Sequence, residues 1–433
     1  MRFAADRTFD VAVVGAGTAG AAAAGFCAEQ GMQVVCIERA RLDCAGARWV
    51  NGVPAQAFER AGLPRPGGDE LRGGQSDFHL VAGRGPERLL IRNHGVVEVD
   101  MRLLVARLQR RARQHGALLV GETAVRSRDG GLLHTDQGTV RARWIVDASG
   151  LSGPRLMPRP PVAARHLCSA AQRVYRIVDR RAAHGFLARH GADLGETLCF
   201  TGIAGGFSIL SMRAEDGQLS ILSGSVTAAG HPSGNALASA FVARHSWIGE
   251  PLFGGARAIP LRRPADRLTD GRVALLGDAA CQVFPAHGSG IATGLVAARI
   301  LADELASGRG LHGYAATWQR ECGGTLAASD AFRRFSQSLT VREVAALIAS
   351  GALDAEIARA GLAQTFPRPP LHSLLGKAIA LRSEIGLAGR LAAALARMIA
   401  TRALYARYPK RPDQLPSWSR AVARLFAETP DVE

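Results

Sequence analysis

Two glycine-rich segments contain the residues whose types and spacing could do chemistry, and the first lies near the start of the sequence. It reads Gly15-Ala16-Gly17-Thr18-Ala19-Gly20 and directly follows the apolar run Phe9–Val14. Glycines at this spacing permit a tight turn, close approach of the backbone to a pyrophosphate and close packing of helix on strand. A helix beginning there would direct unpaired N–H groups at the phosphates. Glu38, which ends the next predicted strand, and Arg39 after it would then bind the ribose side, so the segment predicts a dinucleotide site.

The second segment follows an apolar strand predicted at Arg272–Leu276. It contains Gly277-Asp278, then Pro285, then Gly288-Ser289-Gly290-Ile291 at the start of a predicted helix. Backbone N–H groups at a helix N-terminus can stabilise negative charge at the N1–C2 carbonyl edge of a flavin, and Asp278 can bind ribityl or ribose hydroxyls. A second G-x-G-x-x-G segment is absent, which argues against a separate nicotinamide-binding domain. Together the two segments predict FAD as the cofactor.

These segments resemble those of FAD-dependent monooxygenases of the para-hydroxybenzoate hydroxylase type and of their relatives, the geranylgeranyl reductases and flavin-dependent halogenases. The resemblance implies a further cofactor contact at Arg102, within Val99-Asp100-Met101-Arg102. It also implies contacts at Ala124 and Val125, where the family's adenine-contacting strand runs. The stretch Arg48–Pro54 would run along the flavin ring, with Arg48 on the flavin or its phosphates.

The missing motifs narrow the reaction that the resemblance implies. Halogenases have a Trp-x-Trp-x-Ile-Pro motif and an active-site lysine early in the chain, whereas the lysines here are Lys377 and Lys410. The Tyr-x-x-Trp-x-Pro element of geranylgeranyl reductases is also absent. We therefore expect hydroxylation of an electron-rich aromatic ring through a flavin C4a-hydroperoxide, with NADH, NADPH or a separate flavin reductase as electron source. No catalytic side chain is assigned, because the cofactor supplies this chemistry; Trp49 and His287 are predicted to face the substrate.

Arg48–Pro54 and the loop Cys281–Gly294 also resemble a smaller group of bacterial flavoproteins that mature tryptophylquinone enzymes. That resemblance implies an acidic protein substrate, the small-subunit precursor of a quinohemoprotein amine dehydrogenase, hydroxylated on a protein-bound tryptophan. Three alternatives stay open. They are a small-molecule aromatic hydroxylase of a natural-product pathway, a flavin reductase of the geranylgeranyl-reductase type, and a structural flavoprotein without enzymatic activity.

The formal net charge of +16, almost all of it from arginine, favours an acidic partner. The arginines are dispersed and no nucleic-acid motif accompanies them, so we expect no nucleic-acid binding. Seven dispersed cysteines without a Cys-x-x-Cys pair predict neither a disulfide framework nor a metal site. No apolar run reaches the roughly 18 residues that span a bilayer. A strand is predicted a few residues after Met1, which leaves no room for a signal peptide, so we expect a cytoplasmic protein. The lack of a long apolar run also predicts that there is no transmembrane segment.

The order of the predicted strands and helices that must position these residues indicates an α/β fold. We expect a Rossmann-like FAD-binding domain with an inserted antiparallel β-sheet substrate domain and a helical C-terminal region. The predicted boundaries are 1–75, 95–158 and 265–308 for the FAD-binding domain, 76–94 and 159–264 for the substrate domain, and 309–433 for the C-terminal region. Helical periodicity marks Met101–His115 and Ile291–Leu305. Short strands between glycine turns are predicted at Val174–Val178, Thr197–Phe200, Phe207–Met212 and Leu219–Ser223.

Overall fold

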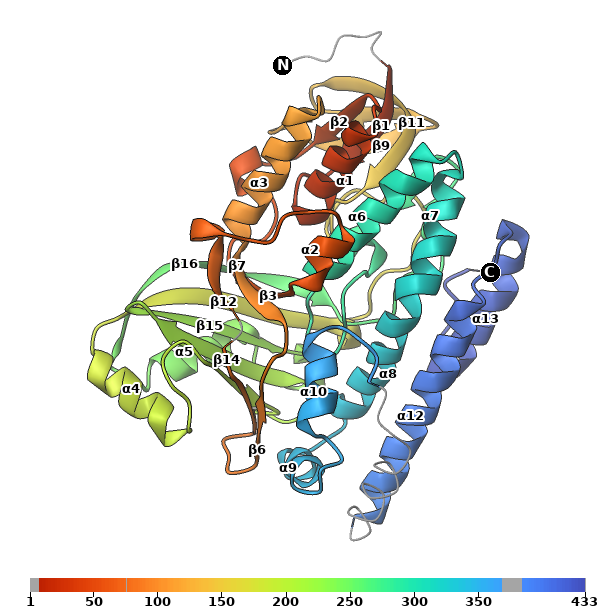
Figure 1. Ribbon diagram of the computed structural model, residues 1–433. Helices are drawn as coiled ribbons and strands as arrows, with labels where there is room; N and C mark the ends of the chain where they lie inside the picture. The colour runs from red at the N-terminus through yellow and green to blue at the C-terminus, as the bar shows by residue number, and fades with distance from the viewer. Residues whose placement is uncertain (1–7, 75, 368–383, 433) are drawn as a thin grey trace.

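The computed structural model describes residues 8–74, 76–367 and 384–432, and it has the predicted α/β fold (Figure 1). An eight-stranded sheet contains the strands that precede the glycine-rich segments, and a seven-stranded sheet lies below it in Figure 1. Helices from the last third of the chain lie along one side of both. Residues 1–7, 75, 368–383 and 433 lie outside the described residues; they include Lys377 and the outer ends of the predicted domains.

The eight-stranded sheet is parallel in its central part. Its order is β17-β18-β11-β1-β2-β8; β10 also pairs antiparallel with β11, and β9 pairs antiparallel with β10. The buried runs VAVV in β1 and VVCI in β2 suit strands that are covered on both faces. The carboxyl ends of β1, β11 and β18 meet at one edge, where a doubly wound sheet binds its ligand. The bounds are β1 (Thr8–Val14), β2 (Val34–Ile37), β8 (Leu118–Val120), β9 (Val125–Asp129), β10 (Leu132–Thr135), β11 (Gly138–Asp147), β17 (Thr269–Asp270) and β18 (Val273–Leu275).

The helices that pack on this sheet include α1 (Thr18–Glu29), α3 (Met101–Gln114) and α6 (Ile291–Ala306). Helix α1 contacts both α3 and α6 (Figure 1). It packs closely because it consists largely of alanine and glycine; a side chain at Gly25 would meet the backbone of Ala112 at 3.5 Å. Asp100 caps α3 by accepting a hydrogen bond from the Arg102 amide.

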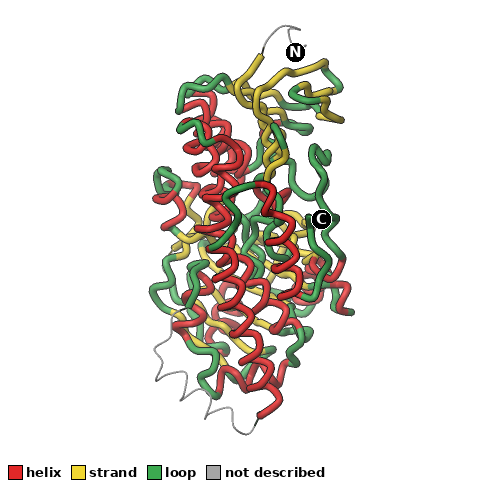
Figure 2. The backbone as a smooth tube through the Cα atoms, turned by 90° about the vertical axis from the view of Figure 1, so that its right-hand side faces the viewer, coloured by secondary structure: helices red, strands yellow, loops and turns green. Residues whose placement is uncertain are grey.

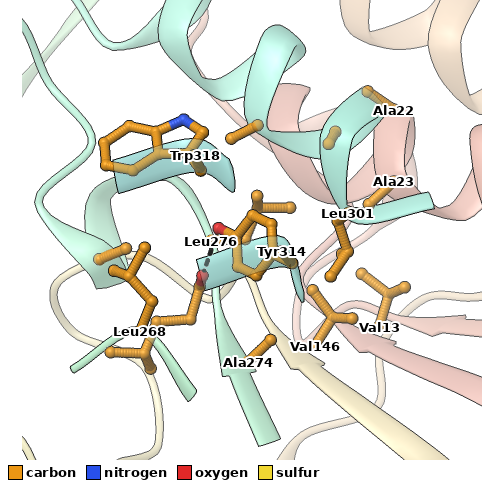
Figure 3. Packing of buried hydrophobic residues seen from close by; sticks show 14 of the residues in the cluster. Val13, Ala22, Ala23, Val146, Leu268, Ala274, Leu276, Leu301, Tyr314 and Trp318 are labelled. Carbon is orange, nitrogen blue, oxygen red and sulfur yellow. Dashed lines mark hydrogen bonds between the residues drawn. The ribbon is translucent and has the colours of Figure 1, made fainter. Parts of the chain in front are cut away.

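A buried cluster fixes β18 to α6 and to α7 (Gly310–Trp318). Figure 3 shows Tyr314 between Leu301 and Trp318, above the strand that carries Ala274. The Tyr314 hydroxyl donates to the Leu275 carbonyl at 2.9 Å, so this buried polar atom is satisfied. The cluster therefore holds the end of β18, from which the second glycine-rich segment continues.

The seven-stranded sheet has the order β16-β12-β15-β14-β13-β5-β6. It is antiparallel except where β13 pairs parallel with β5. A small sheet of β3, β7 and β4 lies between the two large ones (Figure 1). The strands are β3 (Val50–Pro54), β4 (Leu71–Gly74), β5 (Phe78–Ala82), β6 (Arg88–Ile91), β7 (Val96–Asp100), β12 (Leu167–Ile177), β13 (Thr197–Thr201), β14 (Ser208–Glu215), β15 (Gln218–Ser225) and β16 (Ile248–Pro260). The accompanying helices are α2 (Gln56–Arg60), α4 (Arg180–Arg189) and α5 (Gly234–Val242).

The last third of the chain is helical, as predicted. Helix α7 continues through a π-helical turn into α8, and α12 packs along α8; Figure 2 shows these helices in front of the strands. The bounds are α8 (Gly324–Gln337), α9 (Val341–Ala349), α10 (Ala355–Leu362), α12 (Ile385–Ala406) and α13 (Leu415–Phe426). Among the described residues, no helix combines the length and apolar character needed to cross a bilayer.

The segment 427–432, which follows α13, returns to the loop before β17. There Asp431 pairs with Arg262 at 2.7 Å, and Glu428 pairs with Arg263 at 3.3 Å. Glu428 also pairs with Arg334 of α8. All but Arg334 are almost fully buried. The segment is thus held by compensated buried charges rather than by apolar contacts alone.

Candidate functional site

A cavity of about 560 Å³ lies at the carboxyl edge of the eight-stranded sheet and reaches the seven-stranded sheet. We call it the cofactor cavity. Its volume is typical of a small-molecule site. Most of the predicted site residues line it: Gly15, Gly17, Thr18, Ala19, Glu38, Arg39, Trp49, Ala124, Val125, Gly277, Asp278, His287, Gly288, Gly290 and Ile291.

The first glycine-rich segment has the geometry of a phosphate-binding turn. Gly15 has φ +103°, and a Cβ there would lie 2.5 Å from the Ala148 carbonyl oxygen. Gly17 faces the Cα of Gly46, 3.2 Å from where its own Cβ would be. Helix α1 begins at Thr18 without a side-chain cap, so its first N–H groups are free for a ligand. This cradle fits a pyrophosphate that the backbone itself binds.

Glu38 lies at the end of β2 and is nearly buried beside this turn. Its carboxylate accepts hydrogen bonds from the amides of Ala16 at 2.8 Å and Ala40 at 3.1 Å. Arg39 approaches Ser152 across the mouth of the cavity, with nitrogen–oxygen distances of 3.4 to 3.5 Å. Glu38 therefore stabilises the turn through hydrogen bonds from backbone amides. It can also accept hydrogen bonds from ribose hydroxyls on the cavity side.

The second glycine-rich segment is held rigidly by side chains that sequence reasoning missed. Gln282 accepts from the amide of Gly277 at 2.8 Å and donates to the Tyr314 hydroxyl at 2.8 Å. The hydroxyl of Thr293, in the first turn of α6, bonds the Gln282 carbonyl. A glutamine in a predicted loop gave no signal, because its partner Tyr314 is distant in sequence. Burial raises the pKa of Asp278, with Arg257 acting in the opposite direction.

Six predicted cofactor residues do not line the cavity, and two of them have protein partners instead. Arg102 pairs with Asp100 at 2.6 Å, and its guanidinium lies 3.6 Å from the centre of the Phe253 ring. Arg48 donates to the Asp43 carbonyl. Their roles in FAD binding stay predictions that this arrangement does not support. The other four are Ala16, Gly20, Pro285 and Ser289.

Trp49 and His287, the two predicted substrate residues, both line the cofactor cavity. A Cβ at Gly255 would lie 3.7 Å from the Trp49 ring, so β16 passes directly beside the indole. The His287 ring lies 4.9 Å from that of Phe284, and its Nε2 atom is buried without a hydrogen-bond partner. Burial lowers the pKa of His287 to about 4, although the backbone carbonyl groups of Gly361 and His287 oppose this. The imidazole is therefore neutral at physiological pH.

A smaller space of about 150 Å³ adjoins the cofactor cavity, and sequence reasoning did not predict it. We call it the side chamber. The two spaces share Asn51, Ile209, Leu222 and His287 as lining residues. The chamber lies between the small sheet, β13 to β15 and Leu362 at the end of α10. Only the tertiary pairing of these strands creates it, so no local pattern could have indicated it.

Two further observations concern groups that could react or bind metals. All seven cysteines are free thiols; six are buried, whereas Cys44 is exposed and lines the cofactor cavity. Within the described residues, no group of three or more His, Cys, Asp or Glu side chains is placed to hold a metal ion.

Comparison with known proteins connects this geometry to flavoproteins. Residues 8–49 match the family model of the FAD binding domain. A digeranylgeranylglycerophospholipid reductase of Sulfolobus acidocaldarius is 23% identical, over 97% of this chain and 98% of its own. Digeranylgeranylglycerophospholipid reductase 1 of Methanopyrus kandleri is 27% identical, over 79% of this chain and 94% of its own.

Solved structures share the fold at low sequence identity. A geranylgeranyl bacteriochlorophyll reductase-like protein from Thermoplasma acidophilum has a TM-score of 0.69 at 14% identity, covering 88% of this chain and 99% of its own. A variant of the halogenase PltM, solved with FAD, has a TM-score of 0.63 at 16% identity, covering 97% and 96%. The glycine cradle, Glu38 and the N-terminus of α6 fit the pyrophosphate, ribose and flavin of this cofactor.

Proposed function

We propose that this chain, which contains an FAD-binding domain of the FAD-dependent oxidoreductase and monooxygenase superfamily, adds hydrogen across a carbon–carbon double bond of an organic substrate. Support comes from three relatives named as digeranylgeranylglycerophospholipid reductases, one of which aligns over 97% of this chain and the others over 79% and 73%. An isoprenoid alkene is therefore the first substrate class to test.

The observation that carries this proposal is the apolar wall of the cofactor cavity beside the second glycine-rich loop. It is formed by Ala170, Ala171, Phe207, Ile209, Leu222 and Ile259, from strands of the seven-stranded sheet and the turn before β14. Such a wall excludes water and holds an apolar substrate by burial. When bound and reduced, FAD supplies a hydride, and solvent supplies the proton that completes the addition. A two-electron donor such as NADH or NADPH must then restore the cofactor.

The side chamber limits which part of a substrate lies next to the flavin loop. A cavity of about 150 Å³ holds a molecule the size of benzene, and the chamber has this volume. It therefore takes one isoprene unit or one ring, while a longer chain must extend elsewhere. The absence of the Tyr-x-x-Trp-x-Pro element agrees with a substrate unlike that of the named relatives.

The second candidate is hydroxylation of an electron-rich aromatic ring, and two observations favour it. The side chamber has the size of one ring, and an open groove of about 870 Å³ lies next to the cofactor cavity. That groove would suit an acidic protein carrying the ring, such as a tryptophan in a tryptophylquinone enzyme precursor. Its arginines are Arg126, Arg128, Arg155, Arg159 and Arg267, and Arg155 and Arg267 form no ion pair with a described residue.

Halogenation is disfavoured although halogenases share the fold. The sequence contains no lysine before Lys377 and no Trp-x-Trp-x-Ile-Pro motif. The fold similarity at 16% identity therefore does not extend to the residues on which that chemistry depends.

Anaerobic reoxidation of the reduced flavin separates the two candidate reactions. The holoenzyme is reduced with dithionite and mixed without oxygen with a geranylgeranyl lipid, a smaller conjugated alkene or an aromatic ring compound. Alkene-dependent return of the 450 nm flavin absorbance, with a mass gain of two hydrogens on the alkene, supports the reductase. Reoxidation only in oxygen, with a gain of one oxygen on an aromatic ring or on tryptophan, supports hydroxylation and overturns the first proposal.

A further inference from the structure

Three polar groups without partners line the side chamber. They are the Nε2 atom of His287, the hydroxyl of Ser289 and the carboxyl group of Glu98. The first two are buried atoms with no hydrogen bond to any described residue. The Glu98 carboxyl has no hydrogen bond or ion pair among the described residues either.

Leaving such groups unpaired is costly. A buried donor or acceptor without a partner has lost its hydrogen bonds to water and gained none in return, and the loss is larger for a charged group. Asp431 and Glu428, by comparison, are buried carboxylates with ion-pair partners. Other buried side-chain atoms without a partner occur elsewhere among the described residues, but His287 Nε2 and Ser289 Oγ lie together with Glu98 around one space of about 150 Å³. This arrangement indicates a ligand that completes their hydrogen bonds.

The position of Glu98 shows how it reaches the chamber. It lies in β7 opposite Gly52 of β3, and a Cβ at Gly52 would lie 3.5 Å from its Oε1 atom. Gly52 therefore leaves the carboxyl free toward the chamber. Burial raises the pKa of Glu98, opposed by Arg213, whose guanidinium is already bonded to Glu215 and Ser76.

We propose that the side chamber is a polar recognition site, in which Glu98, His287 and Ser289 bind the hydroxyl or N–H group of a substrate one ring in size. An alkyl chain would fill the space but leave all three groups unpaired. A phenol, aniline or similar ring satisfies them, because its substituent both donates and accepts. The inference rests on the proposed function, because it relies on the flavin occupying the cofactor cavity. Beside the flavin it favours the polar ring of the second candidate reaction over an unsubstituted isoprenoid chain.

Binding to the oxidised holoenzyme tests this without turnover. Phenol and toluene are matched probes, because they have the same size and differ in the hydroxyl group. Titration calorimetry should show phenol binding about 10-fold or more tighter than toluene, the effect of one or two hydrogen bonds. Equal affinities, or tighter binding of toluene, would overturn the proposal.

Variants of the side-chamber residues test whether these residues cause the preference for phenol over toluene. In Glu98→Leu and Ser289→Ala the preference for phenol should fall several-fold, whereas Glu98→Gln should retain most of it. Glu356→Gln, on the exposed side of α10, is the matched control and should change nothing. Bound FAD in each variant reports folding. An unchanged preference in Glu98→Leu and Ser289→Ala would contradict the assignment. Phenol binding without any substrate-dependent flavin turnover would instead contradict the proposed function alone.

Discussion

Gly20 lies so close to the preceding turn that a methyl group in its place would be 1.8 Å from the Gly15 carbonyl oxygen. We expect Gly20→Ala to displace the phosphate-binding turn and to abolish stable FAD binding, with overpacking costing about 1–3 kcal/mol or more. The flavin-to-protein absorbance ratio after purification measures this. Gly67→Ala is the control, because Gly67 has φ −151° and its added Cβ would meet nothing within 4 Å. Full flavin content in Gly20→Ala would contradict the geometry.

Glu38 supports the same turn from the other side. Glu38→Ala removes the acceptor for the Ala16 and Ala40 amides and for the ribose hydroxyls. Hydrogen bonds to a charged group contribute about 1.5–3 kcal/mol, so the Kd for FAD should rise roughly 10- to 100-fold. Fluorescence titration of the apoprotein checks this. Asp43→Ala, at an exposed carboxylate paired with Arg41, should leave the Kd unchanged; equal effects of both variants would exclude a specific role for Glu38.

The lowered pKa of His287 predicts that the free energy of unfolding depends on pH. Its pKa falls from 6.5 in the unfolded chain to about 4 in the folded one. Between these values the unfolded chain binds the proton first, so stability is full above pH 6.5 and declines as pH falls toward 4. The decline attributable to this residue is about 3 kcal/mol at most. His287→Asn should remove it, and Tm measured from pH 7 to pH 4 should fall less steeply than in the parent protein.

The control for that comparison is His115→Asn, because His115 is exposed at the end of α3. It should retain the pH profile of the parent protein. A profile in His287→Asn that parallels the parent's would show that other groups cause the acid sensitivity.

At the scale of elements, the segment 427–432 makes a specific contribution to stability. Asp431→Asn weakens the pairing of Arg262 and Arg263, and breaking a buried ion pair typically costs about 3–5 kcal/mol. We expect a clear drop in Tm and in the urea midpoint. Asp413→Asn, in an exposed pair with Arg411, should cost about 0.5 kcal/mol or less. Similar stabilities of the two variants would mean that the buried network is not needed.

Elements defined by local pattern were predictable from sequence, and those defined by distant pairing were not. The unit β1–α1–β2 follows from an apolar run, a glycine turn and a second apolar run. Helix α6 begins at Ile291, and α3 begins at Met101, as predicted. The parallel pairing of β5 with β13 joins segments far apart in sequence, and no local signal specifies it.

The same difference between local and distant contacts explains which predicted site residues line the cofactor cavity and which do not. Glycines and Glu38 belong to one short turn, so their spacing fixes their geometry. Arg102 is a long side chain with several partners in reach, and in the structure it is bound by Asp100 and Phe253. Glu98 and Gln282 have no motif at all; only the assembled sheets show what they face.

For the whole molecule, the cofactor cavity is important because both large sheets contribute to it. FAD bound to the native state alone should stabilise the two sheets together, by about 2.7 kcal/mol at a free concentration of 100 times Kd. Differential scanning calorimetry should show one transition that moves to higher temperature with FAD. ADP, which reaches only the first glycine-rich turn, is the control ligand and should give a smaller shift. A second transition that does not respond to FAD would show that the sheets unfold independently.

The pairing of Arg263 with Glu428 has a kinetic consequence, because it closes a loop of 165 residues. Contacts between such distant residues form late in folding. The loop before β17 also bonds the second glycine-rich segment, through the Ala265 amide and the Ala280 carbonyl. On a ribosome, this loop would emerge together with Asp266, which pairs with Arg263, but long before Glu428 and Asp431, which complete the neutralisation, are synthesised. Cofactor loading should then be the last event of maturation, after translation has passed residue 431.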